Sequence, residues 1–130
     1  MFNLSFSQKI TICFFCFILT AIGFMVKLPS VFRHHDSEMH LLFYFCAAAF
    51  LNLLFQKRHL VIFLFLFFFG IFVELFQGLS RHYFPSLKHG RFDKEDLKYN
   101  VTGLILFSII WMVYKVFSFI YQRIFKNESN

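Results

Sequence analysis

Residues 60–79 read LVIFLFLFFFGIFVELFQGL, and this stretch decides the fold. About 20 apolar residues in a helix span the hydrocarbon core of a bilayer, so its length fits a membrane crossing. Its only ionisable residue is Glu74, and Gln77 follows three positions later. The stretch predicts a transmembrane helix that carries polar groups near one membrane surface.

Three further apolar runs complete the pattern, and the whole chain is 58% hydrophobic and only 15% charged over 130 residues. A soluble domain of this size cannot bury so much apolar surface, because small domains keep much of their surface in water. We therefore predict an all-α integral membrane bundle that forms one domain, residues 1–130. Its four transmembrane helices are expected at about residues 10–26, 38–55, 60–79 and 97–120.

The first run, residues 10–26, also resembles the apolar part of a secretory signal peptide. It is long for that role, and no small-residue cleavage motif follows it, so we expect a retained helix. Cys13 and Cys16 form a C-x-x-C pattern inside this run, and Cys46 lies inside the second run. Because all three lie in apolar surroundings, we interpret them as packing residues and not as redox or metal-binding groups.

The polar segments between the runs contain most of the charge. Residues 27–38 form a loop, residues 56–59 a short hairpin link, and residues 80–99 the longest hydrophilic loop. Asp36 or Ser37 is expected to cap the second helix, and Asp93 the fourth. Residues 122–130 are expected to be a frayed polar tail.

The net charge of +6 does not indicate a nucleic-acid partner. Lys and Arg concentrate in the loops and tails, where they would lie beside lipid headgroups. They are divided almost evenly between the two sides of the bundle, so the charge pattern does not set the orientation. We favour loops 27–38 and 80–99 on the outer side, because a short N-terminal tail is easily retained inside.

Polar residues gather at one end of the predicted bundle. Consecutive membrane helices alternate in direction, so the start of the second, the end of the third and the start of the fourth meet on one side. Residues three or four apart share a helix face, and this spacing gives three polar stripes. The stripes contain Asp36, His40 and Tyr44; Glu74 and Gln77; and Asp96 and Asn100.

Small residues extend two of these stripes, Gly70 on the third helix and Gly103 on the fourth. Because small residues let membrane helices approach closely, we expect the stripes to face the bundle interior. The opposite end offers only Asn52 and the link 56–59.

Glu74 is the deepest of the polar residues. A lone carboxylate at this depth costs about 2–3 kcal/mol on insertion scales, so it must be paired or protonated. His40, Arg81 and Arg91 are its expected partners.

The ordered set Asp36-x-x-x-His40-x-x-x-Tyr44, Glu74-x-x-Gln77 and Arg91-x-Asp93-x-x-Asp96-x-x-x-Asn100-x-x-Gly103 resembles the VanZ-like family of small bacterial membrane proteins. The resemblance covers residues 30–110. It implies a bacterial cytoplasmic membrane and a cell-envelope role of the antibiotic-resistance type, since the founding member is linked to teicoplanin resistance. It implies no particular reaction. The separation of Gln77 from Arg91 is longer than in compact members, so we interpret residues 78–90 as an insertion.

The first functional hypothesis is an interfacial site that binds or modifies a cell-envelope lipid or a lipid-linked cell-wall precursor. Glu74 or Asp96 would form an acid–base pair with His40. Arg91 would hold a phosphate or carboxylate. The further ligand-binding candidates are Asp36, Tyr44, Gln77, Asp93 and Asn100.

Three other hypotheses remain open. In a metal-dependent enzyme His40, Glu74 and Asp96 would supply nitrogen and oxygen ligands, but no H-E-x-x-H is present, and we assign neither a metal nor a cofactor. In a non-enzymatic scaffold the polar residues would fix helix packing or dock a partner. A small transporter would need to form an oligomer. Whether the chain is an enzyme is left open.

Overall fold

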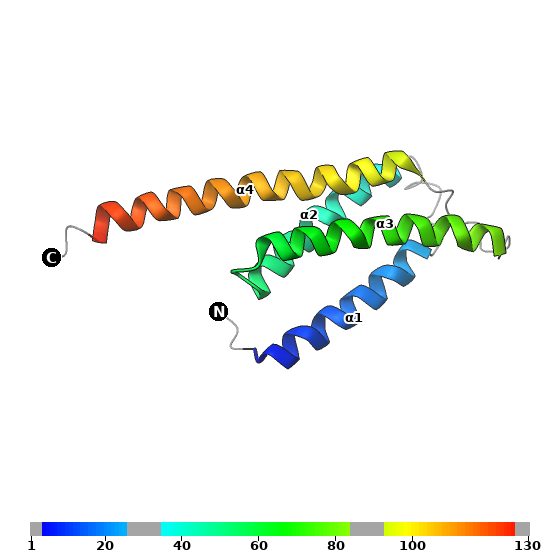
Figure 1. Ribbon diagram of the computed structural model, residues 1–130, viewed down its shortest axis with the longest axis horizontal. Coiled ribbons are helices and arrows are strands. Elements are labelled where there is room, and N and C mark those ends of the chain that lie inside the picture. The colour runs from blue at the N-terminus through cyan, green and yellow to red at the C-terminus, as the bar shows by residue number, and fades with distance from the viewer. Residues whose placement is uncertain (1–3, 26–34, 84–92, 127–130) are drawn as a thin grey trace.

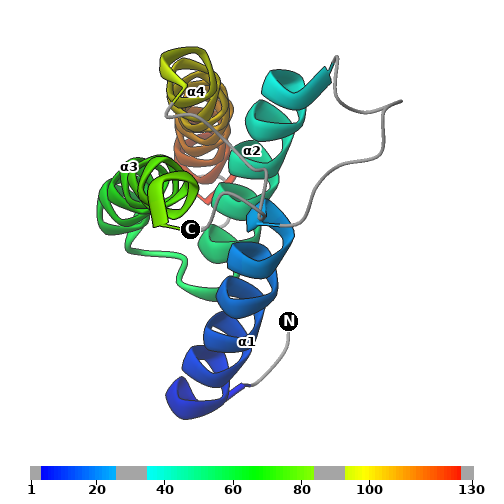
Figure 2. The same cartoon turned by 90° about the vertical axis from the view of Figure 1, so that its right-hand side faces the viewer.

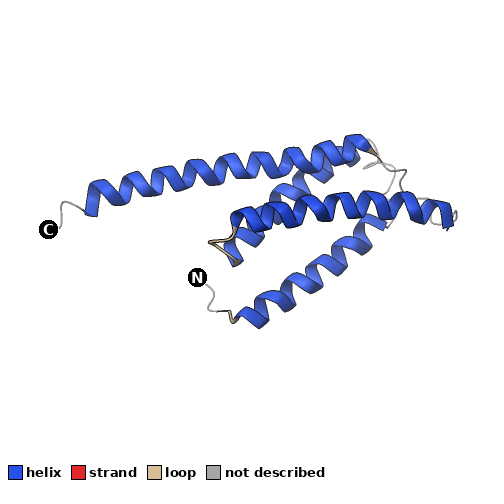
Figure 3. Ribbon diagram, viewed as in Figure 1, coloured by secondary structure: helices blue, strands red, loops and turns tan. Residues whose placement is uncertain are grey.

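The computed structural model describes residues 4–25, 35–83 and 93–126 and shows four helices (Figure 1). They are α1 (Phe6–Met25), α2 (Asp36–Leu54), α3 (His59–Tyr83) and α4 (Lys94–Lys126). The described residues form no strand, as the colouring of Figure 3 makes plain. All four helices are long and apolar enough to cross a membrane, so the prediction of an all-α, multi-pass membrane protein is confirmed.

The outer surface of the bundle is made of large apolar side chains. Leu19, Leu53, Leu60 and Phe117, which come from all four helices, each expose 69% of their surface. A protein with such a surface would aggregate in water, whereas in a bilayer the lipid chains cover the apolar side chains. The apolar majority of the chain therefore faces lipid, and only a narrow seam between the helices is buried.

The seam is centred on α2 and α4, which form the most extensive helix pair. Its buried core consists of Tyr44, Ala48, Leu51, Ile62, Leu66 and Leu104. Gly103 brings the two backbones together, because a Cβ atom added there would collide with the Leu41 carbonyl oxygen. The expectation that small residues permit close helix approach is confirmed at this position.

Helix α1 lies at the edge of the bundle, away from α4 (Figures 1 and 2). Phe17 packs edge-on against Phe65 and Phe69 of α3, with ring centroids 5.0 and 4.9 Å apart. At its N-terminal end, Lys9 Nζ donates a hydrogen bond to the Leu54 carbonyl oxygen at 2.9 Å. These few contacts hold α1 without making it part of the buried seam.

The helix ends differ from the sequence-based expectations at two places. His35 occupies the N-cap of α2 and no side chain caps this helix, so the prediction of a cap at Asp36 or Ser37 is wrong. The Ser37 hydroxyl bonds Asp96 on α4 instead. The cap at Asp93 is confirmed, because Glu95 N donates to Asp93 Oδ1 at 2.8 Å.

Helix α4 is also longer than predicted. It continues to Lys126, beyond the end predicted near residue 120 and into the segment 122–130 that is expected to be a frayed tail. Residues 121–126 contain neither Gly nor Pro, so nothing in their composition stops the helix once it is formed.

Replacing Gly103 by Ala is expected to destabilise the bundle by about 1–3 kcal/mol, the usual cost of overpacking a tight contact. The added methyl group would force α2 and α4 apart. Unfolding by SDS titration of the protein in mixed micelles measures this loss. Gly23→Ala is the matched control, because a Cβ there meets nothing within 4 Å. Equal stability of the two variants would contradict the close approach.

Candidate functional site

Helices α2 and α4 begin, and α3 ends, at the same end of the bundle (Figure 1). A cluster of buried polar side chains lies at this end. At its centre His40, which is only 3% exposed, has its Nδ1 atom 2.9 Å from Asn100 Oδ1. An amide oxygen can only accept, so the imidazole donates through Nδ1–H. In the neutral ring this tautomer leaves the lone pair on Nε2. The bond joins α2 to α4 inside the bundle.

Glu74 brings α3 into the same cluster, and its side chain is fully buried. Its Oε2 atom accepts a hydrogen bond from the Asp93 backbone N–H at 3.2 Å, just before α4 begins. Its Oε1 atom lies 4.0 Å from His40 Nδ1 and has no hydrogen-bond partner. The expected pairing of Glu74 with His40 is thus present as a 4.0 Å contact between a carboxylate oxygen and an imidazole nitrogen, and that oxygen has no hydrogen-bond partner.

Asp36 and Asp96 lie beside His40 toward the end of the bundle. The Ser37 hydroxyl donates to Asp96 Oδ1 at 2.7 Å, which makes a second link between α2 and α4. Asp36, His40 and Asp96 each offer one potential ligand atom, and these three atoms lie within 4.8 Å of one another. The sequence predicts Glu74 as the third potential ligand beside His40 and Asp96, whereas in the structure the third residue is Asp36.

Two more polar atoms face the interior without a hydrogen-bond partner, Tyr44 Oη and Asn100 Nδ2. Both approach Gly70 of α3: a Cβ atom added at that glycine would lie 3.1 Å from Tyr44 Oη and 3.2 Å from Asn100 Nδ2. Counting Glu74 Oε1, three buried polar atoms from three helices are therefore left without a hydrogen-bond partner. Buried polar groups normally find a partner, so this arrangement makes the cluster the candidate binding site.

The predicted site residues are mostly brought together. Six side chains from the three stripes share the cluster, and Asp93 joins it through its backbone N–H. Gln77 is buried one turn from Glu74 on α3. The six side chains that share the cluster are those of Asp36, His40, Tyr44, Glu74, Asp96 and Asn100.

Arg91 lies outside the described residues, as does the side chain of Arg81, so both proposed cationic partners stay predictions.

The opposite end of the bundle holds a second polar cluster that sequence reasoning missed. His59 Nδ1 lies 3.0 Å from Asn52 Oδ1, and His59 Nε2 lies 3.1 Å from Ser108 Oγ. The imidazole stacks on Trp111 with centroids 4.1 Å apart. Because His59 had been placed in the hairpin link, only its position as the first residue of α3 reveals this role.

The two clusters differ in how completely they are satisfied. Asn52 Nδ2 donates to the Ala48 carbonyl oxygen and Ser108 Oγ to the Leu104 carbonyl oxygen, both at 2.8 Å. Among the described residues, the cluster around His59 leaves no buried side-chain polar atom unpaired. It can therefore be understood as a tie between α2, α3 and α4, whereas the cluster around His40 leaves three buried polar atoms without a hydrogen-bond partner.

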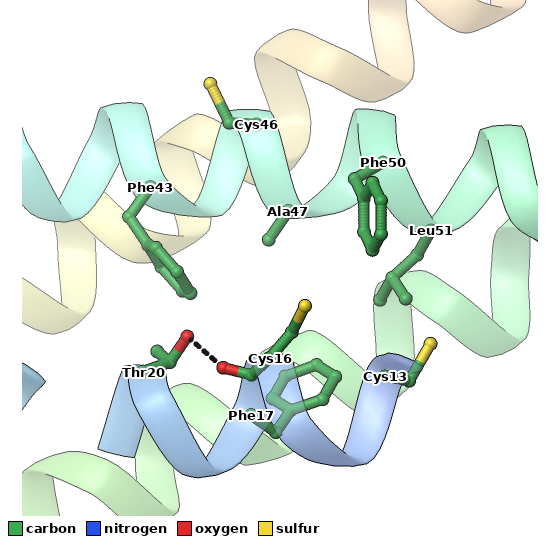
Figure 4. Close-up of a pocket in the computed structure, with 9 residues that line it drawn as sticks. All are labelled: Cys13, Cys16, Phe17, Thr20, Phe43, Cys46, Ala47, Phe50 and Leu51. Carbon is green, nitrogen blue, oxygen red and sulfur yellow. Dashed lines mark hydrogen bonds between the residues drawn. The ribbon is translucent and has the colours of Figure 1, made fainter. Parts of the chain in front are cut away.

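An apolar pocket of about 220 Å³ lies between α1 and α2 (Figure 4). The one hydroxyl in its wall, that of Thr20, already donates to the Cys16 carbonyl oxygen at 2.8 Å. Phe43 lines the pocket, and its ring packs edge-on against Tyr44 at 5.2 Å. The Phe43–Tyr44 contact therefore connects the wall of the pocket to the His40 cluster. The three cysteines of the chain line the pocket as free thiols: Cys13, Cys16 and Cys46.

Comparison with known protein families, with curated proteins and with solved structures finds no match for this chain. The fold and the clusters define a four-helix, multi-pass membrane protein with a buried polar site at one end.

Replacing His59 by Leu is expected to lower stability by about 1–2 kcal/mol, because two interhelical hydrogen bonds are lost. The SDS midpoint of unfolding measures the change. Leu60→Ala serves as the control, since the neighbouring Leu60 faces lipid and its truncation should cost little. An unchanged midpoint for the His59 variant would show that the second cluster does not tie the helices together.

Proposed function

We propose that this chain binds the polar head of a cell-envelope lipid or lipid-linked cell-wall precursor within a bacterial cytoplasmic membrane. The observation that carries the proposal is the set of three unpaired, buried polar atoms, Tyr44 Oη, Glu74 Oε1 and Asn100 Nδ2. Tyr44 Oη can donate or accept, Asn100 Nδ2 donates, and the ionised Glu74 Oε1 accepts, so a headgroup with hydroxyl and phosphate or carbonyl oxygens could pair with all three. No lipid tail could do so.

The position of the cluster supports a lipid ligand. Asp36 and Asp93 lie at the start of α2 and just before α4, at the end of the bundle, while Glu74 lies deeper on α3. The headgroup of a lipid occupies this range of depth in a bilayer. The apolar pocket beside Phe43 offers a place for part of an acyl chain. A molecule with a polar head and an apolar tail therefore matches the two neighbouring features.

The chemistry available to the cluster is proton transfer. His40 Nδ1 and Glu74 Oε1 lie 4.0 Å apart and both residues are buried, so a small approach of the two side chains would bring the imidazole and the carboxylate within proton-transfer distance. Asp96 is held by Ser37 and adds a second carboxylate beside the same imidazole. Modification of the bound headgroup would use His40 with Glu74 or Asp96 as the acid–base pair.

The envelope part of the proposal rests on the resemblance to VanZ-like proteins in the ordered polar residues of the three helices. A glycopeptide-resistance-type role, with loops 27–38 and 80–99 on the outer side, follows from that resemblance and from the cluster's place at the end of the bundle. The anion clamp at Arg91 belongs to the same proposal.

A scaffold is the second candidate function, and one observation favours it. The His40–Asn100 bond is a buried link between the two most extensively packed helices, as a purely structural polar group would be. In that case the cluster would fix the helix packing or dock a partner protein. The two candidate functions differ in one respect: a lipid-binding protein would hold a headgroup against the unpaired atoms, and a scaffold would not.

Glu74→Gln separates these functions. The amide oxygen still accepts the Asp93 N–H and keeps the side-chain shape, so the folded protein should be retained. Binding of a headgroup by Glu74 should weaken at least tenfold, about 1.4 kcal/mol. Native mass spectrometry of the protein in nanodiscs made with bacterial lipid extract measures the bound lipid.

Asn52→Ala is the control, because it weakens the opposite cluster and should leave lipid binding unchanged. If Glu74→Gln retains its bound lipid but loses folded protein from the membrane, the cluster serves packing and the scaffold is the correct function.

A further inference from the structure

We propose that Asp36, His40 and Asp96 form a binding site for a divalent metal ion of the Zn²⁺ type. The metal would attract the anionic headgroup of the bound lipid, and this part of the inference rests on the proposed function. The metal site itself depends only on the three side chains and their neighbours.

The geometry brings three potential ligand atoms within 4.8 Å of one another. Asp36 and His40 are one helical turn apart on α2, and Asp96 lies in the first turn of α4. Ligand atoms bound to zinc at about 2.0–2.2 Å lie roughly 3–3.5 Å apart, so small side-chain rotations would close the set. The close backbone approach at Gly103 keeps α2 and α4 in the register that this requires.

The neighbouring hydrogen bonds are those that metal ligands use. Histidine ligands usually donate their second ring N–H to an oxygen acceptor, which fixes the tautomer and the ring orientation. His40 does so through Nδ1 to Asn100 Oδ1, which places the lone pair on Nε2. Carboxylate ligands are likewise hydrogen-bonded, and Ser37 Oγ donates to Asp96 Oδ1 at 2.7 Å. Both interactions would orient donor atoms for a cation.

The charge balance also favours a dication. Neither Asp36 nor Asp96 has an ion pair with Lys or Arg among the described residues, although both are partly buried at the end of a membrane bundle. Two carboxylates compensate the charge of a divalent ion, and uncompensated carboxylates in such a place are costly. One imidazole nitrogen and two carboxylate oxygens suit Zn²⁺ or Mn²⁺ better than Cu(I), which prefers sulfur.

A second observation points to a ligand at the same imidazole. Glu74 Oε1 belongs to a fully buried residue, has no hydrogen-bond partner and lies 4.0 Å from His40 Nδ1. Among the described residues, the interior beside His40 thus holds a carboxylate oxygen that lacks a donor. A metal would supply the positive charge that an anionic headgroup needs, since the described side chains of the cluster include three carboxylates that would otherwise repel it: Asp36, Glu74 and Asp96.

Zinc binding by the full chain tests the inference. The protein, freed of any affinity tag, is placed in phosphatidylcholine nanodiscs, stripped with a chelator and titrated with Zn²⁺, and the bound metal is counted by elemental analysis. We expect one Zn²⁺ per chain. Asp36→Asn should weaken the affinity about 10–100-fold, and Ser37→Ala about tenfold through the loss of its bond to Asp96. Both residues are partly exposed, so folding should survive.

Two variants with the same chemistry serve as controls. Glu38→Gln removes an exposed acid beside Asp36, and His59→Gln removes the imidazole of the opposite cluster; both should keep the bound zinc. His40→Gln should abolish binding. Absence of zinc from the unaltered protein, or full affinity in Asp36→Asn, overturns the site.

The same nanodiscs with added phosphatidylglycerol separate this inference from the proposed function. Zinc binding without any retained lipid would leave the metal site standing and remove the lipid-binding function. Retained lipid that is indifferent to the chelator, in a protein that binds no zinc, would remove the metal site alone.

Discussion

The hydrogen bond between His40 and Asn100 is the interaction on which the rest of the arrangement depends. It lies in the buried interior between the two most extensively packed helices, and Gly103, one turn from Asn100, lets the backbones of α2 and α4 approach there. Once it is formed, the imidazole is fixed in one tautomer. Glu74 reaches that imidazole from α3, and the aspartates of α2 and α4 lie on its other side.

The polar clusters at the two ends of the bundle differ in how completely their buried side-chain atoms are hydrogen-bonded. Around His59 every buried polar side-chain atom of the described residues has a partner, and an aromatic ring stacks on the imidazole. Around His40, Tyr44 Oη, Glu74 Oε1 and Asn100 Nδ2 remain without one. In a low-dielectric interior a complete network stabilises the fold, and an incomplete one lowers its stability. The incomplete network is therefore the candidate for function.

Much of the cluster could be predicted from spacing alone. Residues Asp36 and His40 are four apart, as are Asp96 and Asn100, so the helical period places each pair on one face. The alternation of membrane helices then brings these faces to the same end as Glu74. The N-cap at Asp93 was predictable as well, because an acid before a charged first turn is a strong local signal.

Other features depend on how the helices rotate and pack against one another, which the local sequence pattern does not indicate. Ser37 was read as a cap, but its hydroxyl reaches across to Asp96, which follows from the crossing of α2 and α4. The same crossing, added to the spacing that puts Asp36 and His40 on one face of α2, brings Asp96 of α4 to them and makes a group of three potential ligands. The role of His59 was hidden because a one-residue difference in where α3 begins separates a link residue from a helix residue.

The most direct test is an experimental structure of the protein in lipid nanodiscs at a resolution that shows ordered lipid. The account predicts non-protein density within hydrogen-bond distance of Tyr44 Oη, Glu74 Oε1 and Asn100 Nδ2, continuous with an acyl chain at the membrane interface. The prediction would be contradicted if Tyr44, Glu74 and Asn100 formed hydrogen bonds with one another and lipid were found only on the outer surface of the bundle.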